Sequence, residues 1–249
     1  MAAPGWLIAR PIAHRGLHDR TAGIPENTIA AAEAAIAGGY AIECDVQPSR
    51  DGEAMVFHDE ALGRLTEASE PIASRDAADL AALTVAGSEQ RIPTLPDFLR
   101  AIAGRTPLII EVKTQFDDDL RLARRVAEAV AAYDGPVALK SFDPHIVGAL
   151  ADFARAEIPR GIVAESSQEN PSYARLTSVQ RFDLANLLHL RESRPDFLSW
   201  RVDDLPGGVP YLCRQLGQMP VMTWTVRTDD QRRNAAAHAD QMVFEGFRP

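Results

Sequence analysis

Short apolar runs rich in Ile and Val recur along the chain, and longer stretches with Ala and Leu at helical spacing separate them. Eight such runs occur, at residues 8–13, 41–46, 107–112, 136–140, 160–164, 197–202, 220–226 and 241–245. Strands that alternate with helices are typical of successive βα units. Eight units in 249 residues match a (β/α)8 barrel, which usually needs about 250 residues. We therefore expect an α/β fold, a (β/α)8 TIM barrel formed as a single domain over residues 1–249.

Helix start signals occur between these runs. Three segments carry them: 28–37 after Asn27, 75–80 after Ser74, and 95–103 after Thr94. Asn, Ser and Thr side chains accept hydrogen bonds from the first backbone amides of a helix, so each is expected as the cap of its segment.

A hairpin signal follows the second run. Asp51 and Gly52 are typical of a two-residue β-turn, and the strand-like piece Ala54–His58 comes after them. The chain is therefore expected to return toward the end of the second strand and to bring His58 with it.

The overall composition restricts the class of partner. The net charge of −9 argues against nucleic acid or an anionic membrane, because those partners require clustered Lys and Arg. Cys44 and Cys213 are the only cysteines, and they are expected as reduced thiols rather than as a disulfide framework. The N-terminal segment lacks a signal-peptide pattern, and no window approaches 18 uncharged apolar residues. We expect a cytoplasmic protein without stable membrane association.

Residues that can carry chemistry lie at or just after predicted strand ends. They form four groups, His14-Arg15-Gly16, Glu26-Asn27-Thr28, Glu43-Cys44-Asp45 and His58-Asp59. The C-terminal ends of the strands are where (β/α)8 barrels build their active sites.

Three carboxylates are expected to converge at this rim. Side chains alternate along a strand, so Glu43 and Asp45 share one face and Cys44 points to the other. Glu111 and Lys113 end the third run in the same way. Crowded carboxylates repel unless a cation neutralises them, and an all-oxygen ligand set suits Mg²⁺ or Ca²⁺ better than zinc. One divalent cation, Mg²⁺ or Ca²⁺, is the expected cofactor.

The order of these motifs resembles the glycerophosphodiester phosphodiesterase family. The resemblance runs through Ala13-His14-Arg15-Gly16, Pro25-Glu26-Asn27-Thr28, Glu43-Cys44-Asp45-Val46, Val56-Phe57-His58-Asp59, Ile92-Pro93-Thr94-Leu95, Ile110-Glu111-Val112-Lys113, Ser141-Phe142-Asp143 and Trp224-Thr225-Val226. It implies a TIM-barrel phosphodiesterase that converts small, soluble glycerophosphodiesters to glycerol 3-phosphate and an alcohol.

The same resemblance implies a role for each matching residue. The implied roles are metal ligands for Glu43, Asp45 and Glu111, a catalytic pair for His14 and His58, phosphate binding for Arg15 and Lys113, and substrate-pocket contacts for Trp224 and Phe142. The chain departs from the family pattern at residues 243–249, where a Thr-Asp-x-Pro-like motif is usual, and residues 165–218 lack family landmarks.

Several alternatives stay open at this point. Glu26 and Asn27 are either support for the site or ordinary helix-capping residues. Either histidine could be the acid, and either direct hydrolysis or a cyclic phosphate intermediate could occur. The rival functions are a lysophospholipid- or sphingomyelin-type phosphodiesterase and a non-catalytic barrel that binds a phosphorylated ligand. A lipid-directed enzyme should show an exposed apolar segment, and none is evident in the sequence.

Overall fold

The computed structural model describes residues 3–249. Contacts divide the chain into two compact units, and neither is one continuous segment. Unit 1 contains the chain up to Ile12, Thr114–Leu120 and Ala138–Pro249. Unit 2 contains Ala13–Lys113 and Arg121–Val137.

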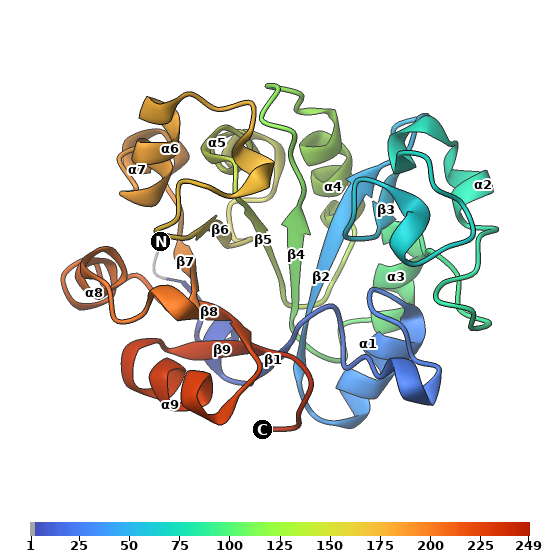
Figure 1. Ribbon diagram of the computed structural model, residues 1–249, viewed down its shortest axis with the longest axis horizontal. Helices are drawn as coiled ribbons and strands as arrows, with labels where there is room; N and C mark the ends of the chain where they lie inside the picture. Colours follow the sequence, from blue (N-terminus) through green and yellow to red (C-terminus); the bar gives the residue numbers. More distant parts are fainter. Residues whose placement is uncertain (1–2) are drawn as a thin grey trace. The chain divides into compact units, whose positions relative to one another are not determined.

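Unit 1 is built from five parallel strands and the helices that connect them (Figure 1). The strands are β5 (Val137–Ser141), β6 (Arg160–Ala164), β7 (Phe197–Arg201), β8 (Val221–Val226) and β9 (Gln241–Phe244), and they pair in chain order. The helices are α5 (Pro144–Phe153), α6 (Ser178–Ala185), α7 (Leu190–Ser193), α8 (Gly208–Gln215) and α9 (Asp229–His238). A buried cluster that includes Ile162, Leu198 and Trp200 packs these strands against the helices.

Unit 2 holds the strands that carry the candidate chemistry. Its main strands are β2 (Ala41–Pro48) and β4 (Leu108–Val112), which pair in parallel. Its helices are α1 (Ile29–Ala37), α2 (Ala77–Leu80), α3 (Leu95–Ile102) and α4 (Arg121–Ala131). The parallel strands and their alternation with helices confirm the predicted (β/α)8 class.

The excursion after β2 is also confirmed, with a longer turn than expected. Strand β3 (Ala54–Val56) pairs antiparallel with β2 and lies beside it in Figure 1. The Ser49 amide donates to the Glu53 carbonyl at 2.9 Å, so the turn contains three residues and not two. Gly52, at φ +86°, closes it, as is common in three-residue hairpin loops. The segment beyond β3 folds over its own apolar cluster, which includes Phe57, Leu62 and Ile72.

The first predicted strand is largely wrong. Only β1 (Ile12–Ala13) is extended within residues 8–13, because Gly5–Ile8 form a 3-10 helix and bends follow it. The other seven runs fall within two residues of the observed strands.

Two of the predicted helix caps need correction. Thr28, and not Asn27, caps α1 by accepting from the Ala31 amide. Ser74 lies in a 3-10 helix, and α2 begins after Asp76. The Thr94 cap of α3 is confirmed, since its side chain accepts from the Asp97 amide.

Two further observations bear on earlier expectations. Cys44 and Cys213 form no disulfide. Across residues 3–249, no helix combines the length and the hydrophobicity that crossing a bilayer would require.

Candidate active site

The turn at His14-Arg15-Gly16 follows β1 and is hydrogen-bonded to Glu43 of β2. The Arg15 amide donates to Glu43 Oε2 at 3.1 Å, and the Gly16 amide donates to the Glu43 carbonyl at 3.1 Å. Gly16 has φ +79°, and a Cβ at this position would lie 2.8 Å from the Ala31 backbone. Glycine is therefore required here by both conformation and space. The turn fixes Arg15 against one of the carboxylates.

The three carboxylates predicted from the sequence do converge. Glu43 and Asp45 lie on β2 and Glu111 lies on β4, with Asp45 directly opposite Glu111 in the strand register. Each offers one oxygen within 4.8 Å of the others. Glu43 and Asp45 are each only 1% exposed, and Glu111 is 5% exposed. Buried oxygen donors at this spacing fit one hard divalent cation.

Two cations of the chain lie against these acids. Lys113 Nζ is 2.7 Å from Asp45 Oδ1 and 2.5 Å from Glu111 Oε1, and Arg15 Nε is 3.3 Å from Asp45 Oδ2. Burial alone would raise the pKa of Asp45, but Lys113, His58, Arg15 and His14 hold it well below its usual range. Burial would lower the pKa of Lys113, yet Asp45 and Glu111 raise it above its usual value. Both groups are therefore ionised at neutral pH.

Asn27 serves the site rather than the helix. Its Nδ2 donates to Asp45 Oδ2 at 2.9 Å, and its Oδ1 accepts from the Asp45 amide at 3.2 Å. The residue has φ +55°, a conformation that Asn tolerates better than most residues. The carboxamide therefore holds Asp45 from both its side chain and its backbone.

The two histidines lie close enough to Asp45 for their charges to lower its pKa. His58 Nδ1 is 2.6 Å from Asp59 Oδ1, and the His58 carbonyl accepts from Gln47 Nε2 at 2.9 Å. Since a carboxylate only accepts, the contact with Asp59 favours a proton on Nδ1 and leaves Nε2 for other partners. His14 is buried.

Glu26 and Arg64 form a further ion-pair group beside the histidines. Arg15 Nη1 donates to Glu26 Oε1 at 2.6 Å, and Arg64 donates to both oxygens of Glu26, at 2.7 and 2.9 Å. Burial would raise the pKa of Glu26, but Arg64 and Arg15 lower it to about 2. The sequence did not single out Arg64, because no spacing rule links it to Glu26.

The predicted pocket residues Phe142 and Trp224 lie in unit 1. Their rings meet edge to face, with centroids 5.5 Å apart, and Trp224 Nε1 donates to the Ser199 carbonyl at 3.0 Å. Tyr173 contacts Phe142, and Phe116 contacts Tyr173, also edge to face. Phe116 and Tyr173 could not be identified from the sequence, because Phe116 lies in a loop and Tyr173 in a short 3-10 helix, and neither belongs to a motif.

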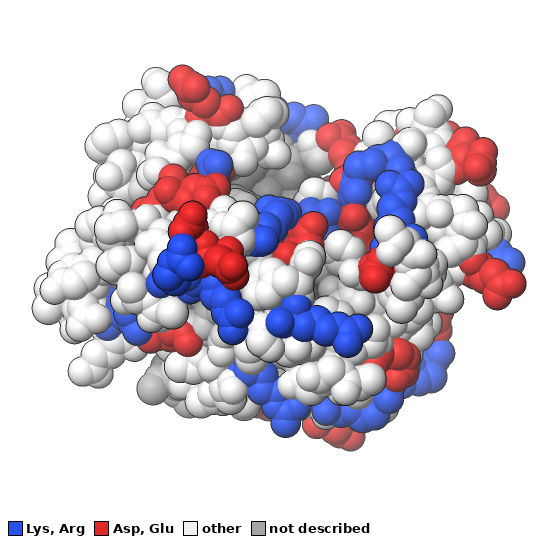
Figure 2. All heavy atoms as spheres, turned by 60° about the horizontal axis from the view of Figure 1, so that its bottom comes forward, with Lys and Arg blue, Asp and Glu red and all other residues white. Residues whose placement is uncertain are grey.

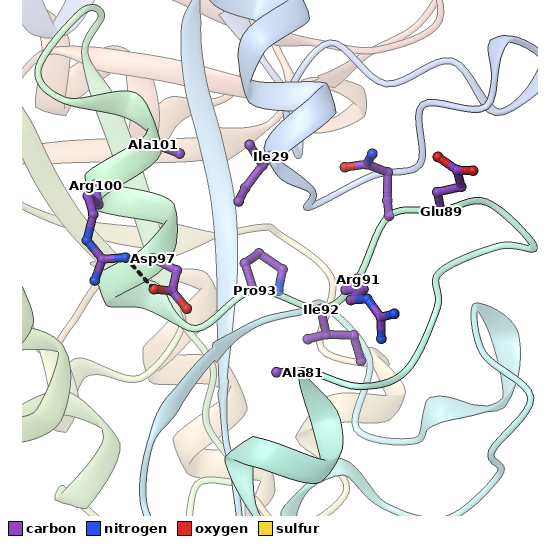
Figure 3. Close-up of a pocket in the computed structure, with 10 residues that line it drawn as sticks. Ile29, Ala81, Glu89, Arg91, Ile92, Pro93, Asp97, Arg100 and Ala101 are labelled. Carbon is purple, nitrogen blue, oxygen red and sulfur yellow. Dashed lines mark hydrogen bonds and ion pairs between the residues drawn. The ribbon is translucent and has the colours of Figure 1, made fainter.

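A separate groove of about 700 Å³ lies on unit 2 (Figure 3). The segment 89–93 borders it, together with Ile29 and a surface ion pair between Asp97 and Arg100. No acid, histidine or lysine of the candidate site lines it. The face drawn in Figure 2 carries acidic and basic side chains interspersed, without a continuous basic surface.

Comparison with known proteins agrees with this geometry. The model of the glycerophosphoryl diester phosphodiesterase family matches residues 14–244. A glycerophosphodiester phosphodiesterase of Caldanaerobacter subterraneus is 38% identical over 113 residues, which are 41% of this chain and 44% of that protein. The uncharacterised protein YqiK of Bacillus subtilis is 35% identical over 137 residues, 51% of this chain and 54% of that protein. The matches thus span about half the length of these curated relatives.

Solved structures share the fold. A Silicibacter pomeroyi protein named as a putative glycerophosphoryl diester phosphodiesterase superposes with a TM-score of 0.76 at 23% identity. The match covers 98% of this chain and 91% of that one. A phosphodiesterase of Oleispira antarctica, solved with the product sn-glycerol-3-phosphate, gives a TM-score of 0.73 at 21% identity, covering 96% and 93%. With its family motifs and the family match over residues 14–244, the chain belongs to the glycerophosphoryl diester phosphodiesterase family.

Proposed function

We propose that this protein hydrolyses small glycerophosphodiesters to glycerol 3-phosphate and an alcohol. The observation that carries the proposal is that two further buried carboxylates, two cations and two histidines lie around Asp45. Family membership and the product bound in the Oleispira antarctica structure support the same substrate class.

One divalent cation, Mg²⁺ or Ca²⁺, would be held by Glu43, Asp45 and Glu111. Their buried oxygens within 4.8 Å of one another support this assignment. When bound, such an ion offsets negative charge on the non-bridging phosphate oxygens. Asn27 would keep Asp45 in place for the ion, since groups that orient ligands affect metal affinity.

The chain's own residues would bind the phosphate and move the protons. Arg15 and Lys113 present positive charge beside the acids, which suits a single phosphate. His14 and His58 would act as the proton-transfer pair, one taking a proton from the attacking hydroxyl and the other giving one to the leaving alkoxide. The contact of His58 Nδ1 with Asp59 supports a role for its Nε2.

Phe142 and Trp224 are proposed as substrate-pocket residues. Phe142 directly follows β5, and Trp224 lies near the end of β8. The C-terminal ends of barrel strands are where substrates bind in this fold. Both rings are half-buried and therefore keep surface for a ligand.

Initial rates with and without a chelator test the proposal. The substrates are glycerophosphocholine, glycerophosphoethanolamine, lysophosphatidylcholine and a dinucleotide at equal concentration. The small glycerophosphodiesters should react fastest, and the chelator should abolish turnover until metal is restored. Fastest cleavage of the lysolipid or the dinucleotide, or full activity in chelator, would contradict it.

The lysolipid has a structural reason to be included. Exposed large apolar side chains, which the sequence did not lead us to expect, occur around α6 and α8: Val179, Phe182, Leu188, Tyr211, Leu212 and Leu216. Exposed apolar side chains mark a contact surface where they form a continuous patch, whereas single ones are common on any protein. The assay decides whether a lipid substrate benefits from these side chains.

A further inference from the structure

Arg64 joins two groups of the candidate site that are far apart in sequence. It lies in the 3-10 helix Leu62–Arg64, after β3. Its Nε and Nη2 donate to the two oxygens of Asp59, at 2.5 and 3.1 Å. Its Nη1 and Nη2 also donate to the two oxygens of Glu26, at 2.9 and 2.7 Å. One guanidinium thus makes two bidentate pairs.

Each of these carboxylates holds a residue proposed to meet the substrate. Asp59 Oδ1 lies 2.6 Å from His58 Nδ1, and Glu26 Oε1 accepts from Arg15 Nη1 at 2.6 Å. A continuous series of contacts therefore runs from the imidazole of His58 through Arg64 to the guanidinium of Arg15. All of it lies within unit 2.

We propose that Arg64 is a positioning residue that, through Asp59 and Glu26, fixes the His58 imidazole and the Arg15 guanidinium in a single relative arrangement. This inference rests on the proposed function of these two residues. Without Arg64, the carboxylate of Asp59 could rotate away from the imidazole, and Glu26 could leave Arg15. Small misplacements of reacting groups cost much of the rate, on the order of 10²-fold for about 1 Å.

The two bidentate pairs of Arg64 depend on the planar shape of its guanidinium. Its planar fork offers parallel N–H groups to two carboxylates at once, whereas an ammonium offers a point charge. Arg64→Lys therefore keeps the charge and removes the double pairing, so a loss of activity in this variant reports geometry more than electrostatics.

Arg105→Lys is the matched control. The Arg105 side chain is 42% exposed against 45% for Arg64, it lies in the same unit, and it also makes a bidentate pair, with Glu33. Glu33 is not part of the candidate site, so this variant measures the general effect of exchanging Arg for Lys in a half-exposed ion pair.

The first measurement is steady-state kinetics on glycerophosphocholine with metal present. Arg64→Lys should lower kcat about tenfold or more, while Arg105→Lys stays within about twofold of the wild type. For Arg64→Ala, guanidinium chloride at tens of millimolar should raise kcat several-fold, whereas sodium chloride at the same concentration should leave kcat unchanged. A structural role alone would change thermal stability without this rescue.

The second measurement does not depend on turnover. Long-range ¹H–¹⁵N spectra of the His58 ring should show a proton fixed on Nδ1 in the wild type and in Arg105→Lys, and an altered ring signal in Arg64→Lys. If the wild type is inactive on all diesters, the proposed function fails, yet these spectra still decide the role of Arg64. An unchanged His58 signal in Arg64→Lys, or kcat equal to that of Arg105→Lys, overturns the proposal.

Discussion

Asn27 shows how one side chain can serve a backbone turn and a charged site together. Its left-handed conformation lets the chain turn before α1, and both ends of its carboxamide bind Asp45. An Asn before an Ala-rich helix suggests a cap equally well, so the sequence could not distinguish the two roles. Only the approach of β2, whose Asp45 is 18 positions further along the chain, decides between them.

Asn27→Ala should weaken metal binding by about 10- to 100-fold, because a group that orients a ligand is lost. Titration calorimetry with Mg²⁺ and with Ca²⁺ would measure the change. Asn170→Ala is a suitable control, since Asn170 also donates to a buried carboxylate, that of Glu165, which is not among the proposed ligands. Equal affinities in Asn27→Ala and the wild type would show that Asp45 needs no such support.

His14→Ala and His58→Ala should each lower turnover about 10²-fold or more and leave the fold intact, because each removes a proton-transfer group. Steady-state rates on a natural diester would measure this, with circular dichroism as the check on folding. His238→Ala, at an exposed position of α9, should behave as the wild type. Near-normal turnover in either of the first two variants would remove that histidine from the mechanism.

The ion pairs of Glu26 should make stability depend on pH in acid. Its pKa of about 2 lies below the ordinary value of 4.5, so its contribution is complete above about pH 4.5 and is lost as the pH falls toward about 2. Unfolding free energies of the wild type and Glu26→Gln, measured by urea denaturation from pH 6 to pH 2, should therefore converge in acid. A constant difference across this range would contradict the assignment.

At the scale of elements, the regular strands and the hairpin after β2 could be predicted, whereas the contacts made by irregular segments could not. Seven of the eight apolar runs became strands because burial on both faces leaves a clear hydrophobic signal. Glu43, Asp45 and Glu111 could be located for the same reason, since they are charged residues within otherwise apolar strands. The contacts of Arg64 and Phe116 could not be predicted, because both residues lie in irregular segments whose positions no hydrophobic periodicity indicates.

The turn after β1 gives a prediction at this scale. Gly16→Ala should lower the free energy of unfolding by about 2 kcal/mol or more, since Ala is disfavoured at φ +79° and its Cβ would meet Ala31. Gly208→Ala should change little, because beyond the neighbouring residues and the backbone of α8 no heavy atom lies within 4 Å of the new Cβ. Urea denaturation would measure both. Equal stabilities of the two variants would mean that the turn relaxes without strain.

At the scale of the whole molecule, the expectation of one domain over residues 1–249 stays a prediction. The two compact units are interleaved along the chain, with Thr114–Leu120 assigned to one unit and the residues on either side to the other. Neither unit can therefore be cut out as a single segment. The cytoplasmic location expected from the sequence also stays a prediction.

Calorimetric unfolding should accordingly show one transition, with equal calorimetric and van't Hoff enthalpies, because an interleaved chain couples the two units. Intrinsic fluorescence followed in parallel should give the same midpoint. Two separated transitions, or different midpoints by calorimetry and fluorescence, would show that the units fold independently.

The position of Lys113 has a consequence for the order in which the protein is made. Glu43 and Asp45 leave the ribosome long before Glu111, so the growing chain first carries two acids and then receives a third. Strand β4 delivers that third acid and, two residues later, the ammonium that lies against both Glu111 and Asp45. As the nascent chain pairs β4 with β2, the added negative charge and its counter-charge arrive together. The strand thus brings its own compensation for a charge that would otherwise oppose the pairing of β4 with β2.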